Sequence, residues 1–118
     1  MSKSEESPLL CKTYDLMLWM MPALTKFPKE QRFRLAARIE SALFDFHGNI
    51  LSASRTLQRQ ELLKQADLEL EKLRIYLRLS LELKCVSFQQ YEHAVRLANE
   101  VGKLLGGWMK YNKIAAAG

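Results

Sequence analysis

The sequence has few of the residues that interrupt or cross-link a chain: five glycines, three prolines and two cysteines among 118 residues. Cys11 and Cys85 stand far apart, without a CxxC pair or neighbouring histidines. This favours reduced thiols packed as small apolar groups over a disulfide or a metal site. No apolar run approaches the ~20 residues that a membrane-spanning helix needs. The sequence therefore predicts one domain with no membrane partner, no metal and no other cofactor.

Residues typical of catalytic sites are also scarce. The two histidines, His47 and His93, have no ligand spacing such as HxxxH between them. There is no glycine-rich phosphate loop and no nucleophile elbow, and most carboxylates have a lysine or arginine three or four positions away rather than a second acid. We therefore expect a binding or assembly protein and not an enzyme. The opening MSKSEESP does not have the pattern of a secretion signal, so we expect the protein to be cytoplasmic.

Charge of both signs is present, with an excess of positive charge. Eighteen lysines and arginines stand against thirteen aspartates and glutamates, which gives a net charge of +5. The isoelectric point is near 9.4. A basic balance favours polyanionic partners, although composition alone makes nucleic acid only slightly preferred over other partners.

Apolar residues recur with the period of a helix, and strand-like alternation is absent. The predicted fold class is all-α, an up-down-up-down four-helix bundle. We predict its four helices at residues 9–26, 29–54, 60–84 and 88–111. Pro22 is expected to bend or break the first helix, and Pro28 to start the second. Ser87 and Gln90 form a capping-box pattern that starts the fourth.

The predicted domain organisation is simple. Residues 1–8 are expected to form a disordered head, residues 9–113 the bundle, and residues 114–118 a flexible tail. The chain is long enough to bury one core and too short for two ordinary domains.

The predicted helix at residues 60–84 has more leucine than the interior of one bundle requires. One apolar stripe suits the core and consists of Leu62, Ala66, Leu70, Leu73, Leu77 and Leu81. A second stripe, covering much of the other side, consists of Leu68, Ile75, Leu79 and Leu83. Because one stripe is enough for a bundle core, the second stripe needs another surface to cover it. The simplest cover is another copy of the chain.

Between the stripes lies a charged wedge, made of Asp67, Glu71, Arg74, Arg78 and Glu82. The spacing by itself favours a solvated face of ion pairs three and four residues apart. The alternative is that Arg74 and Arg78 form a docking site, because the planar guanidinium is favoured at interfaces and on phosphates.

The last predicted helix carries three glycines near its end. Gly102 and Gly106 are four apart and lie on one face, which indicates a close crossing with another helix. Trp108 is expected in the core or an interface, with base stacking as the minority interpretation. Lys103 and Lys110 lie on the mostly basic polar side of this helix.

Three segments together resemble the Avd family: KFPKEQRFRLAARIE at residues 26–40, LEKLRIYLRLSLELK at 70–84 and VGKLLGGWMKYNK at 101–113. Avd proteins are accessory variability determinants of diversity-generating retroelements. They belong to a wider group of four-helix-bundle proteins that includes ribosomal-RNA intervening-sequence proteins. The resemblance covers residues 14–113. It implies a barrel-like homopentamer that binds nucleic acid and the retroelement's reverse transcriptase. With template RNA, that complex makes adenine-mutagenised cDNA that diversifies a target gene.

Carried over to this sequence, the resemblance implies that Arg74 and Arg78 contact the reverse transcriptase. The acids Asp67, Glu71 and Glu82 temper the charge there, which suits a protein partner better than bare phosphate. A homopentamer would bury the second stripe between protomers. Candidates for contact with template RNA or cDNA, selected by charge, are Lys26, Lys29, Arg32, Arg34, Arg38, Lys103 and Lys110.

The expected function is thus a non-catalytic accessory subunit that supports mutagenic cDNA synthesis and retrohoming. One alternative is a stand-alone structural or interaction protein of the wider four-helix-bundle group, with an unknown partner. Another is a helical dimer that is merely basic.

Overall fold

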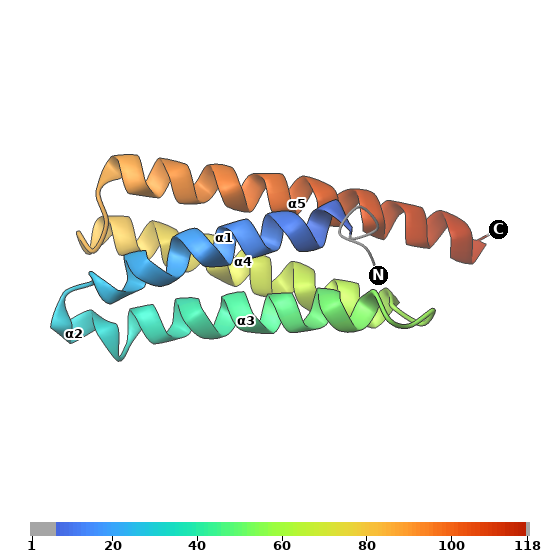
Figure 1. The fold of residues 1–118 in the computed structure, drawn as a ribbon, viewed down its shortest axis with the longest axis horizontal. Coiled ribbons are helices and arrows are strands. Elements are labelled where there is room, and N and C mark those ends of the chain that lie inside the picture. The colour runs from blue at the N-terminus through green and yellow to red at the C-terminus, as the bar shows by residue number, and fades with distance from the viewer. Residues whose placement is uncertain (1–6, 118) are drawn as a thin grey trace.

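The computed structural model describes residues 7–117, and it is helical throughout this range apart from turns and short connections. Its helices are α1 (Pro8–Thr25), α2 (Lys29–Arg32), α3 (Leu35–Ala53), α4 (Gln60–Glu82) and α5 (Phe88–Ala117). The four long helices lie side by side and run in alternate directions (Figure 1), with α3 packed most extensively on α4. The predicted all-α four-helix bundle is therefore confirmed. No helix in the described range is long and apolar enough to cross a bilayer.

The first helix begins one residue before its predicted start, and the last helix ends beyond its predicted limit. Ser7 caps α1, because its Oγ accepts a hydrogen bond from the Leu9 backbone N–H at 3.1 Å. Pro8 then occupies the first helical position, where its missing N–H costs nothing. Of the predicted head, residues 1–6 lie outside the described range. At the other end α5 runs to Ala117, through most of the predicted tail, since this segment is rich in alanine.

The predicted helix at residues 29–54 is in fact two helices. The break falls at Arg34, whose φ of −109° and ψ of −83° are not helical. The four residues of α2 bury no side chain, whereas Phe27 and Leu35 on either side are both buried. We infer that the break allows both of these apolar side chains to enter the core. Pro22 does not end α1, which continues through it to Thr25.

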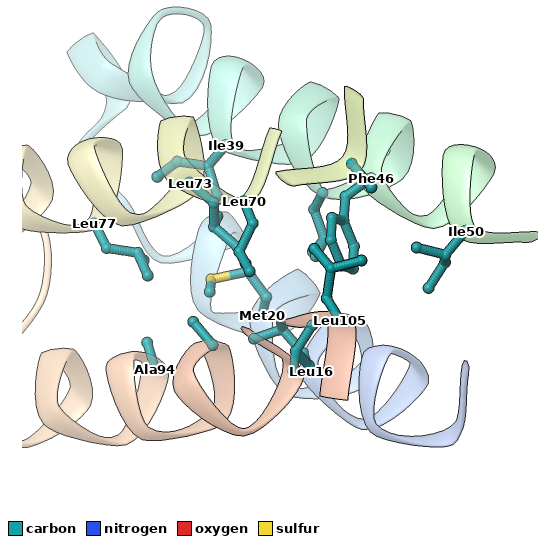
Figure 2. Packing of buried hydrophobic residues seen from close by; sticks show 14 of the residues in the cluster. Leu16, Met20, Ile39, Phe46, Ile50, Leu70, Leu73, Leu77, Ala94 and Leu105 are labelled. Atoms are coloured by element: carbon teal, nitrogen blue, oxygen red, sulfur yellow. The ribbon is translucent and has the colours of Figure 1, made fainter. Parts of the chain in front are cut away.

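Side chains from all four long helices form the core. Figure 2 shows Leu16 and Met20 of α1 and Phe46 of α3 pointing toward residues of the other two helices, which include Leu70 and Leu105. On α4 the buried stripe differs from the predicted one at both ends. Leu63 and Ser80 are buried, whereas Leu62 and Leu81 are only half-buried.

Buried hydroxyl groups are satisfied within their own helices. The Thr13 hydroxyl donates to the Leu9 carbonyl at 2.7 Å, and the Ser80 hydroxyl donates to the Tyr76 carbonyl at 2.8 Å. Such local bonds remove the cost of burying a polar group, so both residues are compatible with an otherwise apolar interior.

The connection between α4 and α5 combines a left-handed residue with a capping box. Lys84 has a φ of 60°, which reverses the chain after α4. The predicted box is confirmed: the Gln90 N–H donates to Ser87 Oγ at 3.1 Å, and the Ser87 N–H donates to Gln90 Oε1 at 2.8 Å. Cys85 lies in the same connection, where burial raises the pKa of its thiol. It forms no disulfide with Cys11.

We predict that Leu73→Ala lowers the free energy of unfolding by about 2–5 kcal/mol, because it removes a fully buried side chain and leaves a cavity. Urea denaturation followed by circular dichroism measures this change. Leu57→Ala is the control, since Leu57 is 92% exposed and its truncation should be nearly neutral. Equal destabilisation of the two variants would contradict this account of the core.

Candidate functional site

Both arginines of the charged wedge make the ion pairs that their spacing predicts, but only loosely. Arg74 Nη1 lies 3.8 Å from Glu71 Oε2, and Arg78 Nε lies 3.7 Å from Glu82 Oε1. These distances are at the long end of the range for ion pairs, and exposed pairs of this kind contribute little to stability. The side chain of Arg78 is 75% exposed. Both guanidinium groups therefore keep hydrogen-bond donors for a partner.

Arg74 lies in a groove between α4 and α5, which we call the α4–α5 groove. It has a volume of about 590 Å³ and is lined by Arg74, Arg96, Asn99, Glu100, Gly102 and Lys103. The Glu100 carboxylate is engaged by Lys12 of α1, at 3.4 Å. Within residues 7–117, Arg96 and Lys103 make no ion pair. The groove therefore carries an excess of positive charge.

A second positive region, the basic end, lies where α1, α2 and α3 meet (Figure 1). It contains five of the predicted nucleic-acid contacts, Lys26, Lys29, Arg32, Arg34 and Arg38, all of them exposed. Glu30 is the single acid between positions 26 and 38. None of the five cations pairs with a carboxylate in the part of the chain that is described. The connection that carries the exposed Lys84 lies at the same end of the bundle (Figure 1).

Two of these arginines also border an apolar groove between α3 and α4. Its volume is about 760 Å³, and Arg34 and Arg38 line it together with Phe33, Leu79 and Leu83. Phe33 is 85% exposed, so a large aromatic side chain stands beside two cations. Arg34 and Arg38 thus have surroundings that suit a protein side chain as well as a phosphate.

The second stripe of α4 is not covered by its own chain. Leu68, Ile75, Leu79 and Leu83 are 55%, 55%, 40% and 47% exposed, on the side of α4 that faces away from the core. Leu68 also lines a shallow groove of about 410 Å³ with Phe44 and Gly48 of α3. A run of exposed apolar residues along one face marks an interaction surface.

The structure divides the predicted site residues among four places, of which the basic end is one. Lys103 joins Arg74 in the α4–α5 groove, whereas Arg78 lies one turn farther along α4 and does not line that groove. Lys110 is exposed on α5 and does not line the α4–α5 groove. Arg96 was not among the predicted sites. Arg96 precedes Lys103 by seven residues, which puts both on one face of a helix. This spacing could have identified Arg96 from the sequence.

From its middle onward, α5 differs from one prediction and agrees with another. A close approach to a neighbouring helix occurs at Gly102 but not at Gly106, around which the space is open. Trp108 is half-buried against the core, as expected, and the Arg59 guanidinium lies over its ring at 5.3 Å from the centroid. This interaction ties the connection after α3 to α5.

A family model described as bAvd-like matches residues 9–112, nearly the whole described range. The chain belongs to the bAvd-like family. The resemblance based on the segments at 26–40, 70–84 and 101–113 is thereby confirmed. A search of curated proteins found no match. In the described part of this bAvd-like chain, no three His, Cys, Asp or Glu side chains are grouped so that they could hold a metal ion.

Proposed function

We propose that this bAvd-like protein is a non-catalytic accessory subunit of a diversity-generating retroelement. It binds the reverse transcriptase and its template RNA, and it supports mutagenic cDNA synthesis and retrohoming. The observation that carries this proposal is the family match over residues 9–112. The separate positive and apolar surfaces of the chain support it, because an accessory subunit must hold several partners at once.

Reverse transcriptase binding is assigned to Arg74 and Arg78. Both side chains lie on the charged wedge, flanked by acids to which they are only loosely paired. Such a mixed surface suits a protein partner, since a complementary arrangement of charges fixes orientation and disfavours other partners.

Template RNA or cDNA binding is assigned first to the basic end. Its lysines and arginines are exposed and have no ion-pair partner in the described range, so they are available to phosphates. Lys103 and Lys110 extend positive charge along α5. Binding of this kind releases counterions from the nucleic acid and must weaken as salt is added.

Assembly into a homopentamer is assigned to the second stripe. The four exposed apolar side chains of the second stripe form the extended apolar face that a neighbouring protomer would cover. Five copies of a chain with a net charge of +5 would also concentrate positive charge for RNA.

The alternative function is a stand-alone interaction protein with the same fold. The apolar groove with Phe33, Leu79 and Leu83 favours it, because this groove can receive a protein side chain without any nucleic acid. Purification that yields a complex without a reverse transcriptase or RNA would support this alternative.

For assembly, we expect light scattering to give a solution mass of five times the 13.7 kDa chain. Ile75→Glu with Leu79→Glu should give a smaller mass, because charges would replace the apolar surface of the second stripe. The control Leu57→Glu adds a carboxylate to an exposed loop and should keep the wild-type mass. A wild-type monomer or dimer would refute the pentamer.

For RNA, we expect Lys29→Ala with Arg32→Ala to weaken binding of a structured RNA. The slope of log affinity against log salt should become shallower by roughly 0.7–0.9 for each phosphate that the variant no longer neutralises. Filter binding at several salt concentrations measures both quantities. Lys64→Ala with Lys113→Ala removes equal charge elsewhere on the surface, and an equal effect of that control would refute a specific role for the basic end.

For the polymerase, we expect Arg74→Ala with Arg78→Ala to weaken binding to the reverse transcriptase of the same retroelement in a pull-down. The fold and the solution mass should be unchanged, because these exposed ion pairs contribute at most about 1 kcal/mol each. The matched control is Arg55→Ala with Lys64→Ala. Normal binding by the Arg74/Arg78 double variant would overturn the assignment.

A further inference from the structure

A glycine makes room for Arg74. A Cβ atom placed on Gly102 would overlap Nη2 of Arg74, and it would lie 3.5 Å from Cζ of the same guanidinium and 3.4 Å from Leu70 Cδ2. The guanidinium therefore occupies the space in which any other side chain at position 102 would begin. Gly106 and Gly107 differ, because a Cβ on either would have no heavy atom within 4 Å. Of these three glycines, only Gly102 thus leaves space that a side chain of α4 fills.

The place that Arg74 reaches is the α4–α5 groove, where other cations lie close by. Arg96 and Lys103 line the groove from the α5 side, and Asn99 adds an uncharged amide donor. Glu100 is the single acid in the lining, and Lys12 engages its carboxylate. Three positive side chains from two helices therefore share one concave surface. An arrangement of this kind favours an anion, because a bound negative charge offsets the repulsion among the three cations.

We propose that Gly102 is a positioning residue for this groove, and that Arg74, Arg96 and Lys103 bind a carboxylate from an acidic segment of a protein partner. The inference rests on the proposed function only where it expects the reverse transcriptase to supply that segment. Gly102 acts through Arg74: it keeps the guanidinium in the groove beside the two cations of α5 instead of letting it extend into solvent.

The charges around the groove favour a carboxylate over the phosphates of a nucleic acid. On α4, Glu71 precedes the arginine pair and Glu82 follows it, and Glu100 lies within the groove. A nucleic-acid strand carries a phosphate at every nucleotide, so a strand bound along this surface would meet these acids. A protein segment can place an acid over the cations alone, and the arginine fork matches a single carboxylate.

The test compares Gly102→Ala with Gly106→Ala. Both variants add one methyl group to the same helix and raise its helix propensity, so neither should lower the melting temperature. Only Gly102→Ala displaces the Arg74 guanidinium, and because that group is the far end of a flexible side chain, the bundle should stay folded. Circular dichroism verifies the fold of both variants before binding is measured.

Two fluorescent probes, a short glutamate-rich peptide and an oligouridine of equal charge, are titrated at low salt. We expect the peptide to bind Gly102→Ala about tenfold more weakly than wild type, and Gly106→Ala as wild type, because only the former removes a charged hydrogen bond. Arg96→Ala and Lys103→Ala should also weaken it. Equal peptide affinity of the two glycine variants would overturn the inference. So would an oligouridine affinity that falls in Gly102→Ala while the peptide affinity does not.

A pull-down with the reverse transcriptase of the same retroelement separates this inference from the proposed function. If wild type does not retain the polymerase but peptide binding depends on Gly102, the proposed function is refuted and the carboxylate site in the groove is supported. If both glycine variants retain the polymerase as well as wild type does, and peptide affinity is also unchanged, the carboxylate site in the groove is refuted and the proposed function is supported.

Discussion

The packing of α4 between α3 and α5 is the interaction on which the rest of the structure depends. Leu70, Leu73 and Leu77 place one side of this helix in the core. That orientation decides what the other sides can do. It turns Arg74 toward α5, and it leaves Ile75 and the rest of the second stripe facing solvent. A single helix therefore contributes to the interior, to a charged groove and to an exposed apolar face.

The proposal that the bAvd-like chain binds several partners rests on the separation of these surfaces. The five exposed cations of the basic end make no ion pair within the described residues, and Glu30 is the single acid between positions 26 and 38, which suits a polyanion. The α4–α5 groove mixes acids and bases, which suits a protein surface of complementary charge. The second stripe is apolar and extended, which suits a neighbouring chain. Three kinds of chemistry thus occupy three different places on one small bundle.

Much of the fold was predictable because its determinants are local. The spacing of leucines on α4, the capping box at Ser87 and Gln90, and the helix start after Pro28 all act within a few residues. The break at Arg34 was missed, because no glycine or proline marks it and its cause is the burial of side chains in the core of the whole bundle. Gly106 was wrongly expected to contact a helix, since spacing reports a shared face and not the distance to a neighbour.

The sequence by itself determined which residues share a helical face, since the period of a helix follows from backbone geometry alone. The two apolar stripes, the charged wedge and the family membership all follow from that order of residues. Only the tertiary structure decided that Gly102 admits the Arg74 guanidinium, and that Arg96 and Lys103 stand beside it. The physical reason is that the rotation of α5 against α4 is set by the packing of the whole core, to which every long helix contributes.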